Sequence, residues 1–458
     1  MNRLKRVEIS YQDPNERINN FEEVCLGYTK KEAVLEAKRC LQCKNPQCVP
    51  LCPVSIDIPG FIDAISKEDF EKAGEILNYY SSLPAVCGRV CPQEDQCEST
   101  CILGNKGDPI AIGKLERFAS DWAIDNGISF NKNIEKKGKK VAVIGSGPAG
   151  ISCGGELLKR GYDVTIFEAL HKPGGVLVYG IPEFRLPKEK IVKKEIDNLI
   201  KLGGKIETNV IIGKTITIDE IFEEGFDAVF IGSGAGSPLF LNIPGINLNG
   251  VYSANEYLTR NNLMMAFKEN SDTSIKVGKS VTVIGGGNVA MDAARTARRY
   301  GSKVDVIYRR TKNELPARDE EIENAIEEGI NFHYLSAPVE IIGDENKEVS
   351  KIKCIKMELG EEDSSGRKSP IPIENSEFII DTDMVILALG TNPNLLIPTS
   401  TPDLKVDDKM RIIVNEDGKT SKENTYAGGD NVTGSATVIL AMGAGKKTAQ
   451  KIDLLLSK

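Results

Sequence analysis

Histidine is almost absent from this sequence, since the 458 residues include only His171 and His333. Neither has a convincing serine or cysteine partner close by in the sequence, so we do not expect a nucleophile–histidine triad. Long apolar runs are absent too: no stretch approaches the roughly 20 apolar residues that a membrane-spanning helix needs. The basic N-terminal segment is not followed by the apolar run of a signal peptide. These absences predict a cytoplasmic protein that does not enter a membrane.

Positive charge is in deficit as well. The chain has 58 lysines and arginines against 66 aspartates and glutamates, which gives a net charge of −8. An acidic chain is not expected to bind nucleic acid through bulk electrostatics. The apolar fraction of 40% is enough for sizeable cores, and the length exceeds that of one typical domain. We therefore expect two or three domains.

Cysteine, by contrast, is concentrated near the start of the chain. Eight of the eleven cysteines occur in two runs, 40-CLQCKNPQCVPLCP-53 and 87-CGRVCPQEDQCESTC-101. In a reducing cytosol such runs indicate metal rather than disulfides. Zinc ribbons usually pair two C-x2-C knuckles, whereas Cys52-Pro53 and Cys91-Pro92 are similar to the Cys-Pro ends of bacterial ferredoxin motifs. The pattern favours iron–sulfur over zinc, and eight sulfurs suffice for two [4Fe–4S] clusters.

The rest of the chain contains one α/β unit twice. The first copy, 141-VAVIGSGPAG-150, leads through a helix to the strand 164–168, and the second, 281-VTVIGGGNVA-290, leads through a helix to 304–310. Strand, glycine turn, helix and strand in this order form a dinucleotide-binding βαβ unit. We predict an α/β chain with a helical N-terminal iron–sulfur domain and two Rossmann-like domains. The polar stretch 126–140 is predicted to be a linker.

The first glycine turn has the features of a complete dinucleotide site. Gly145 permits the tight turn, Gly147 lets the pyrophosphate approach the backbone, and Gly150 lets the helix pack closely on the sheet. Glu168 ends the next strand, where a carboxylate can bind ribose hydroxyls. The alternative is an ordinary glycine turn with a solvated glutamate.

The C-terminal segment 428-GGD-430 indicates that this dinucleotide is FAD. Asp430 follows a short strand and two glycines, which suits the ribityl chain and pyrophosphate of a flavin. The helix beginning near Thr437 could direct its positive end toward a reduced, negatively charged flavin. The alternative is that Asp430 is only a turn residue.

The second glycine turn predicts a site for NADP(H). It reads GxGxxA, with its key positions at Gly285, Gly287 and Ala290. Tyr308 occupies the place that corresponds to Glu168, and Arg309 and Arg310 follow it. Two guanidinium groups in place of a carboxylate can bind a 2′-phosphate. The alternative is a solvated arginine pair at a strand end.

Taken together, these motifs resemble a known family. The chain resembles the small (beta) subunit of NADPH-dependent glutamate synthase in CLQCKNPQCVPLCPVSIDIPGFI, LPAVCGRVCPQEDQCESTC, IAIGKLERFASDW, GSGPAG, KPGGVLVYGIPEFRLPK, GGGNVAMDAARTA, YRR and AGGDNVTG. It looks closer still to the large subunit of NADH-dependent ferredoxin:NADP oxidoreductase, and it is similar to the N-terminal half of dihydropyrimidine dehydrogenase. The resemblance covers nearly the whole chain.

The resemblance implies how the domains are arranged. A helical domain with two [4Fe–4S] clusters would span residues 1–135. An FAD domain would span 136–255 and 386–458, with an NADP(H) domain inserted at 256–385, as in adrenodoxin reductase. The motifs add further residues to the expected FAD site: Pro148, Ala149, Gly175, Val176, Arg185, Gly429, Thr437 and Val438. They add two to the NADPH site: Asn288 and Val289.

The resemblance also implies crossed ligation of the clusters. One cluster would use Cys40, Cys43, Cys48 and Cys101. The other would use Cys52, Cys91 and Cys97, with a carboxylate as the fourth ligand, which falls on Glu116. Spacing alone assigns Cys87 as the eighth ligand, so the two arguments conflict, and our prediction follows the resemblance.

The implied activity is that of an FAD- and iron–sulfur-dependent NAD(P)H oxidoreductase. Hydride transfer needs positioning and electrostatics from the protein rather than a catalytic acid or base, so none is expected. Nothing in the chain resembles a terminal acceptor domain, which implies a partner subunit. Segment 236–264 favours the bifurcating branch, with a ferredoxin-reductase-like flavoprotein subunit and ferredoxin as partners. The alternatives are the glutamate synthase large subunit as partner, and a non-catalytic iron–sulfur scaffold.

Overall fold

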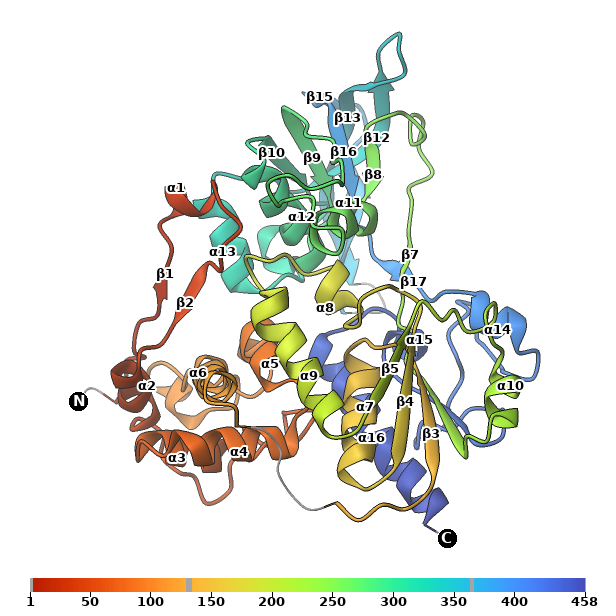
Figure 1. The fold of residues 1–458 in the computed structure, drawn as a ribbon. Helices are drawn as coiled ribbons and strands as arrows, with labels where there is room; N and C mark the ends of the chain where they lie inside the picture. The colour runs from red at the N-terminus through yellow and green to blue at the C-terminus, as the bar shows by residue number, and fades with distance from the viewer. Residues whose placement is uncertain (1–2, 129–133, 363–365, 458) are drawn as a thin grey trace.

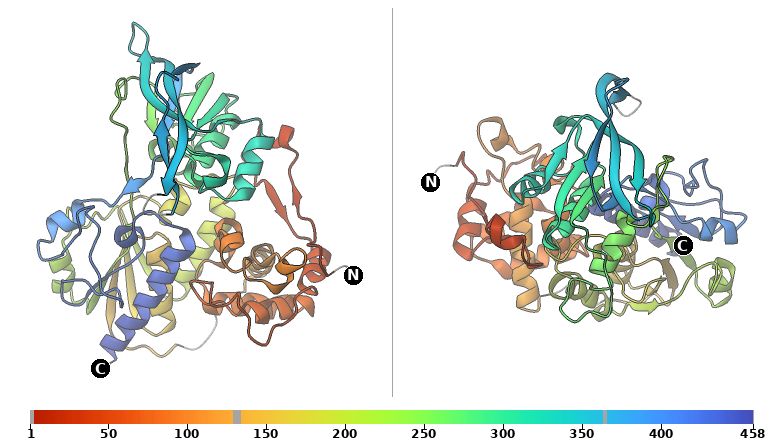
Figure 2. Two further views of the ribbon diagram at one scale, coloured as in Figure 1. Left: turned by 180° about the vertical axis from the view of Figure 1, so that it is seen from behind. Right: turned by 90° about the horizontal axis from the view of Figure 1, so that it is seen from above.

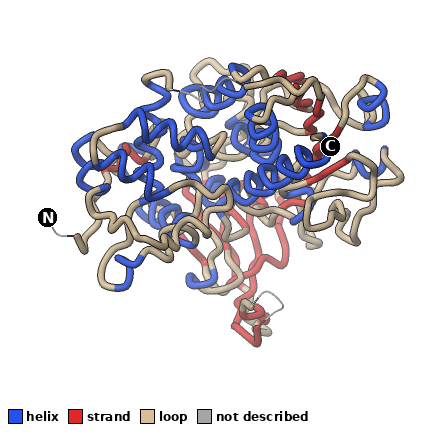
Figure 3. Tube along the Cα trace, turned by 90° about the horizontal axis from the view of Figure 1, so that it is seen from below, coloured by secondary structure: helices blue, strands red, loops and turns tan. Residues whose placement is uncertain are grey.

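The structure is a computed structural model that describes residues 3–128, 134–362 and 366–457 (Figure 1). Part of the predicted linker, 129–133, lies outside the described residues. A helical N-terminal region, in red and orange, packs beside two α/β regions, one above the other in the view of Figure 1. Seen from below, most of the helices gather on one side and a β-hairpin projects from the other (Figure 3). None of the described helices is long and apolar enough to cross a membrane.

The N-terminal region is built from short helices, three of which have side-chain N-caps. These are α2 (Lys30–Ala37), α3 (Ile58–Ser66), α4 (Phe70–Tyr80), α5 (Pro84–Val90) and α6 (Ile112–Asp125), with the 3-10 turns η1 (Gln93–Asp95) and η2 (Ile102–Asn105). The side chains of Asp57 and Asp69 accept hydrogen bonds from backbone N–H groups in the first turns of α3 and α4, which fixes where these helices begin. Seven of the eight cysteines of the two runs lie in the irregular segments that follow α2 and α5, and Cys87 lies on α5 itself.

The first α/β region contains a parallel five-stranded sheet of order β18-β6-β3-β4-β5. Its strands are β3 (Lys140–Ile144), β4 (Asp163–Glu168), β5 (Lys205–Thr208), β6 (Ala228–Ile231) and β18 (Thr425–Ala427). Its helices are α7 (Pro148–Lys159), α8 (Val176–Tyr179), α9 (Lys193–Lys201), α10 (Ile218–Glu223), α14 (Leu396–Ser400), α15 (Asp430–Thr433) and α16 (Val438–Leu456). Because β18 comes from the end of the chain, the sheet is completed only after a long insertion.

The insertion forms a second parallel sheet of order β11-β10-β9-β16-β8. Its strands are β8 (Val251–Ser253), β9 (Ser280–Ile284), β10 (Lys303–Ile307), β11 (Asn331–His333) and β16 (Met384–Leu387). Its helices are α11 (Ala254–Asn262), α12 (Asn288–Arg299) and α13 (Asp319–Glu327). The sheet begins at Val251, before the boundary expected at residue 256, because β8 is too short to be recognised in the sequence.

An antiparallel sheet extends the insertion, and a strand pair connects it to the first region. The antiparallel strands are β12 (Ser336–Gly343), β13 (Val349–Glu362), β14 (Lys368–Pro372) and β15 (Phe378–Asp381). The chain enters and leaves the insertion through the antiparallel pair β7 (Ser237–Pro238) and β17 (Thr391–Asn392), visible between the two regions in Figure 1.

An arm from the N-terminal region reaches the insertion. It consists of β1 (Ser10–Tyr11), α1 (Pro14–Arg17) and β2 (Cys25–Gly27), and it runs up to α13 in Figure 1. Arg17, only 1% exposed, donates hydrogen bonds to Glu327 and Glu328, each at 2.9 Å. The ring of Phe21 lies 5.1 Å from Phe267 and 5.4 Å from Tyr300, both in the insertion. The arm thus ties the insertion to the N-terminal region.

The hydrophobic cores divide the molecule differently from the sheets. One continuous core joins the helical region to the first α/β region, with α16 packed between them (Figure 2). The insertion has separate cores. At Gly443 of α16 an added Cβ would lie 2.8 Å from the Cβ of Pro53, and at Gly445 it would lie 2.2 Å from the carbonyl oxygen of Ala149. These two glycines let α16 approach both the Cys52-Pro53 turn and α7.

We predict that Gly443→Ala destabilises the protein by roughly 1–3 kcal/mol, because the methyl group overlaps Pro53. Helix propensity alone favours alanine over glycine by up to about 1 kcal/mol, so a net loss has to come from the overlap. Thermal unfolding of the holoprotein would measure it. Gly236→Ala is the control, since an added Cβ there meets nothing within 4 Å. A Gly443→Ala protein as stable as the wild type would contradict the close packing.

Candidate functional site

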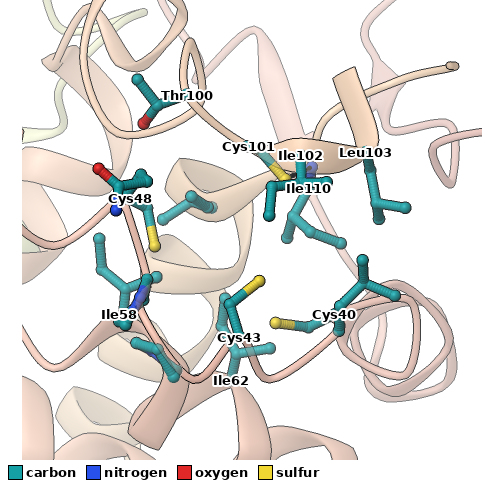
Figure 4. Close-up of a pocket in the computed structure, with 15 residues that line it drawn as sticks. Cys40, Cys43, Cys48, Ile58, Ile62, Thr100, Cys101, Ile102, Leu103 and Ile110 are labelled. Atoms are coloured by element: carbon teal, nitrogen blue, oxygen red, sulfur yellow. Dashed lines mark hydrogen bonds between the residues drawn. The ribbon is translucent and has the colours of Figure 1, made fainter. Parts of the chain in front are cut away.

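Four cysteines surround one cavity near the surface of the N-terminal region. Figure 4 shows the sulfurs of Cys40, Cys43, Cys48 and Cys101 directed toward a common space. Most of the other residues that line the cavity are apolar, among them Leu41, Ile58, Ile62, Ile102, Leu103, Ile110 and Ile112. Cys101 comes from a segment more than 50 residues after the other three. The cavity therefore joins residues of both cysteine runs.

The chemistry of this cavity fits a metal cluster. Burial, and then the neighbouring Cys40 thiol, raises the pKa of Cys48 to about 11. Burial also raises the pKa of Cys40, and Cys101 and Cys43 add to the shift. Thiolates in such a place repel one another unless a positively charged centre compensates them. The four sulfurs predicted as ligands of one cluster are thus brought together, and their ligation stays a proposal.

A second group lies within the N-terminal region, where Pro53, next to Cys52, packs against α16. It contains Cys52, Cys91, Cys97 and Glu116, of which all but Cys52 are buried. Burial raises the pKa of Cys52 to about 11, and Glu116 and Cys91 add to that shift. Burial, then Glu98, and then Glu116 and Cys91 raise the pKa of Cys97. Both thiols are therefore within electrostatic reach of Glu116 and Cys91.

Glu116 is the most unusual member of the group. Its Oε1 atom is buried and accepts no hydrogen bond from the described residues. Burial, and then the negative charge of Glu195, raises the pKa of Glu116 to about 8. A buried carboxylate oxygen without a donor costs free energy, and a cationic centre beside it would relieve that cost. Glu116 therefore suits the role of a fourth ligand.

Cys87 lies at the edge of the same group. Its Sγ atom is fully buried, 3.5 Å from Sδ of Met442 on α16. A hydrogen bond to Cys91, followed by burial, raises its pKa. The thiol therefore lies between the second group and α16. The choice between Glu116 and Cys87 as a ligand stays open, and we propose Glu116.

The flavin-type turn lies between β3 and α7. Gly145 has a φ of +94°, and an added Cβ at Gly147 would meet nothing within 4 Å, which leaves room for a pyrophosphate beside the backbone. The turn continues into Pro148, Ala149 and Gly150, which begin α7. Glu168 is buried, and it accepts hydrogen bonds from Ser146 N at 3.0 Å and Leu170 N at 2.8 Å. Its carboxylate therefore also fixes the turn.

Two distant segments meet this turn, as the flavin hypothesis requires. Gly175, which precedes Val176 and α8, packs so closely that an added Cβ would lie 2.8 Å from Cα of Gly147. Gly429 lies beside Ala149, where an added Cβ would be 3.0 Å from the Ala149 Cβ. Segments that are far apart in the sequence thus meet at the turn and form one cradle.

Asp430 and the start of α16 complete the cradle. Burial raises the pKa of Asp430 to about 6, and a hydrogen bond from Ala436 N at 3.3 Å partly opposes this. Thr437 caps α16 by accepting a hydrogen bond from Leu440 N, and the helix begins at Val438. The positive end of α16 is therefore held at the cradle.

The second glycine turn lies between β9 and α12. Gly285 has a φ of +140°, and the helix begins at Asn288, whose side chain accepts a hydrogen bond from Arg318 N at 3.2 Å. Val289 is 43% exposed and Ala290 is buried. The turn, including Gly287, thus presents its backbone at the surface while its last position packs on the sheet.

The two arginines after β10 have different surroundings. Arg309 is exposed, whereas Arg310 is 3% exposed and its Nε donates to the carbonyl oxygen of Lys368 on β14, at 2.7 Å. The antiparallel hairpin that covers Arg310 is distant in sequence, so its contact was not foreseen. Arg309 is better placed to meet a 2′-phosphate from solvent.

Arg185 does not point into the flavin cradle. Its Nη1 contacts both carboxylate oxygens of Asp292 on α12, at 2.6 and 2.8 Å, and its Nε lies 3.0 Å from Oε1 of Glu321. It therefore binds the first α/β region to the insertion. Nearby, burial lowers the pKa of Lys188 to about 7. The sequence analysis assigned Arg185 to the FAD site and did not predict its pairing with Asp292, because no local pattern relates positions more than a hundred residues apart.

Comparisons with known proteins agree with this geometry. The family described as dihydropyrimidine dehydrogenase domain II, 4Fe-4S cluster, matches residues 17–128, and the pyridine nucleotide-disulphide oxidoreductase family matches residues 139–445. The expected iron–sulfur domain, FAD- and NADP-binding oxidoreductase domain and α/β fold class are confirmed. The 4Fe-4S match supports iron–sulfur over zinc.

Relatives resemble the chain along its length. The small chain of NADPH glutamate synthase from Halomonas elongata is 34% identical, over 98% of this chain and 98% of that protein. The NADPH-Fe(3+) oxidoreductase subunit beta of Geobacter sulfurreducens is 34% identical, over 96% of this chain and 68% of that protein. The expected resemblance to glutamate synthase small subunits is confirmed.

Solved structures share the fold. FprA of Mycobacterium tuberculosis in complex with NADPH aligns with a TM-score of 0.58 and 22% identity, over 70% of this chain and 84% of that one. Lactococcus lactis thioredoxin reductase aligns with a TM-score of 0.51 and 22% identity, over 70% of this chain and 99% of that one.

Iron content tests the second group. We predict that Glu116→Ala loses one of two clusters, roughly four iron atoms per chain, because a ligand is missing, while Cys87→Ala keeps its full iron. Iron and acid-labile sulfide in anaerobically purified protein would measure this. Cys153→Ala, a buried cysteine of α7, is the control and should keep all its iron. Full iron in Glu116→Ala with a loss in Cys87→Ala would reverse the assignment.

Nucleotide preference tests the arginine pair. We predict that Arg309→Ala weakens NADPH binding roughly 10- to 100-fold, the worth of hydrogen bonds to a charged group, and leaves NADH binding largely unchanged. Dissociation constants from fluorescence titration would check this, with Lys312→Ala as a neighbouring control. An equal loss for both nucleotides would show that Arg309 does not recognise the 2′-phosphate.

Proposed function

Because this chain belongs to the family of NADPH glutamate synthase small chains and to the pyridine nucleotide-disulphide oxidoreductases, we propose that it moves electrons between NADP(H), FAD and two [4Fe–4S] clusters. It is an oxidoreductase with an iron–sulfur domain and an FAD- and NADP-binding domain. When bound, FAD would accept two electrons from NADPH as a hydride and release them one at a time. The chain's own residues bind and orient the cofactors.

The observation that carries this proposal is the position of α16. Its first turn belongs to the flavin cradle, and further along it packs against the N-terminal region. Lys446 donates hydrogen bonds from Nζ to the carbonyl oxygens of Val54 and Tyr80, both at 2.7 Å. Met442 contacts Cys87. One rigid helix therefore links the cradle to the second cysteine group.

The order of the sites follows from burial. Cys91, Cys97 and Glu116 of the second group are buried, whereas all four cysteines around the first cavity are partly exposed. Cys97 and Cys101 are separated by only three residues, so the two groups are adjacent. We place the second group next to FAD and the first group at the exit to a partner. In this order the cluster next to FAD is enclosed, and the cluster farther from FAD is accessible to a partner.

We propose that a second subunit completes the reaction, with FAD-based bifurcation as the leading assignment. Its basis is segment 236–264, which resembles the large subunit of NADH-dependent ferredoxin:NADP oxidoreductase. The second candidate is electron supply to a glutamate synthase large subunit. The matches to glutamate synthase small chains over 98% of this chain favour that candidate.

The cofactor content tests the core of the proposal. We predict that anaerobically purified protein contains FAD, iron and acid-labile sulfide, and that its yellow-brown colour is bleached by NADPH faster than by NADH. Absorbance spectra and cofactor analysis would measure this. A colourless protein, or a coloured one that NADPH does not bleach, would contradict the proposal, and the latter would favour a non-catalytic scaffold.

The partner can be tested separately. We predict that the holoprotein, mixed with a ferredoxin-reductase-like flavoprotein subunit, couples NADPH oxidation to reduction of both NAD⁺ and ferredoxin. Glutamate formation from glutamine and 2-oxoglutarate with a synthase large subunit, without ferredoxin reduction, would instead establish the second candidate. Heat-denatured partner is the control for each mixture.

A further inference from the structure

Arg318 lies at the junction between the second glycine turn and the second cysteine group. It precedes α13, and its backbone N donates to the side chain of Asn288 at 3.2 Å. The preceding residue, Ala317, donates from its backbone N to the carbonyl oxygen of Gly286 at 3.2 Å. Two consecutive residues are therefore hydrogen-bonded to the turn on which the phosphates of NADP(H) are expected to lie.

The side chain of Arg318 points the other way, into the N-terminal region. Its guanidinium is buried, and Nη2 donates to Gln93 Oε1 at 3.0 Å. Nε and Nη2 contact the two carboxylate oxygens of Glu94, at 2.9 and 3.1 Å, and Nη1 donates to the carbonyl oxygen of Arg89 at 3.1 Å. Gln93 and Glu94 lie in the segment between Cys91 and Cys97, two predicted cluster ligands.

The segment that Arg318 holds is itself tightly packed. Gln93 is 5% exposed, and its Nε2 donates to the carbonyl oxygen of Cys87 at 3.0 Å. A planar guanidinium with several fixed donors suits this set of acceptors, and an ammonium group does not. Loss of the guanidinium would leave buried acceptors without donors. The glycine turn and the Cys91–Cys97 segment therefore cannot shift independently of each other.

A second contact reinforces the first. Glu320, at the start of α13, accepts hydrogen bonds from Lys114 Nζ at 2.7 and 3.0 Å and from the hydroxyl group of Tyr11 at 2.9 Å. Lys114 is on α6, two residues before Glu116. The start of α13 thus contacts two of the three segments that supply the second cysteine group: α6 and the segment that follows α5.

We propose that Arg318 couples occupancy of the NADP(H) site to the redox state of the second cysteine group. The inference rests on the proposed function. Phosphates bound on the 285–290 turn add negative charge next to Asn288. Because the backbone of Arg318 is bonded to Asn288 and its side chain to Gln93 and Glu94, a movement of the turn also moves the Cys91–Cys97 segment. Such coupling is reciprocal: reduction of the cluster changes nucleotide affinity by the same factor by which the nucleotide changes the reduction equilibrium.

The experiment measures binding rather than activity. The probe is 2′-phospho-ADP-ribose, which lacks the nicotinamide and is not reduced. Its dissociation constant is measured by anaerobic calorimetry with the holoprotein oxidised and with the holoprotein reduced by dithionite. We expect the two constants of the wild type to differ about 5-fold or more, the lower range of known couplings. We also expect the probe to change the electron paramagnetic resonance spectrum of the reduced cluster.

The variants separate coupling from simple support of the fold. Arg318→Ala and Arg318→Lys should bring the two dissociation constants together and abolish the spectral change. Glu94→Gln weakens the same contact from the N-terminal side and should have the same effect. It serves as the test if neither Arg318 variant folds. Arg260→Ala is the control, because the Arg260 side chain on α11 forms an ion pair with Glu256 at the surface, away from this junction. It should retain the wild-type difference.

The outcomes distinguish this inference from the function on which it rests. Equal constants for the wild type in both redox states, with clusters and binding intact, would overturn the coupling alone. So would an unchanged ratio in Arg318→Ala, or a loss of affinity that is the same in both states, which is what mere support of the turn predicts. A wild type without clusters, or without affinity for the probe, would overturn the proposed function as well.

Discussion

The close approach of α16 to both of its neighbours is the constraint on which the rest of the structure depends. Gly445 lets the helix contact α7 behind the flavin turn, and Gly443 lets it contact Pro53 beside Cys52. A side chain at either position would push apart elements that belong to one continuous core. Packing, rather than a flexible linker, therefore sets the separation between the flavin cradle and the second cysteine group.

The insertion is attached in a different way. Its main cores are separate, and its contacts with the other regions include buried ion pairs, such as Arg17 with Glu328 and Arg185 with Asp292. Buried ion pairs contribute little net stability because desolvation offsets the attraction, but they are costly to break singly. Such contacts favour one orientation of the NADP(H) region over others. The N-terminal region and the first α/β region share one core, and ion pairs and hydrogen bonds orient the insertion against them.

Local sequence patterns were sufficient for much of this description. Both glycine turns and both cysteine runs are short and could be recognised without any knowledge of the fold. The assignment of the C-terminal segment around Asp430 to the first nucleotide site could be made in the same way. The partners of side chains could not be predicted in the same way. Arg310 donates a hydrogen bond to the carbonyl oxygen of Lys368, and Arg318 contacts Glu94, 224 residues away. Glu168 was expected to meet a ribose, yet it also binds the turn itself through Ser146. Such pairings arise from the packing of whole domains, which no local pattern encodes.

Rapid freeze-quenching after mixing the oxidised holoprotein with NADPH tests the central claim most directly. If α16 holds the flavin next to the second cysteine group, the paramagnetic signal of a reduced iron–sulfur cluster should rise as soon as the flavin absorbance falls, in the absence of any partner. A flavin that becomes fully reduced while every cluster stays oxidised would contradict the account.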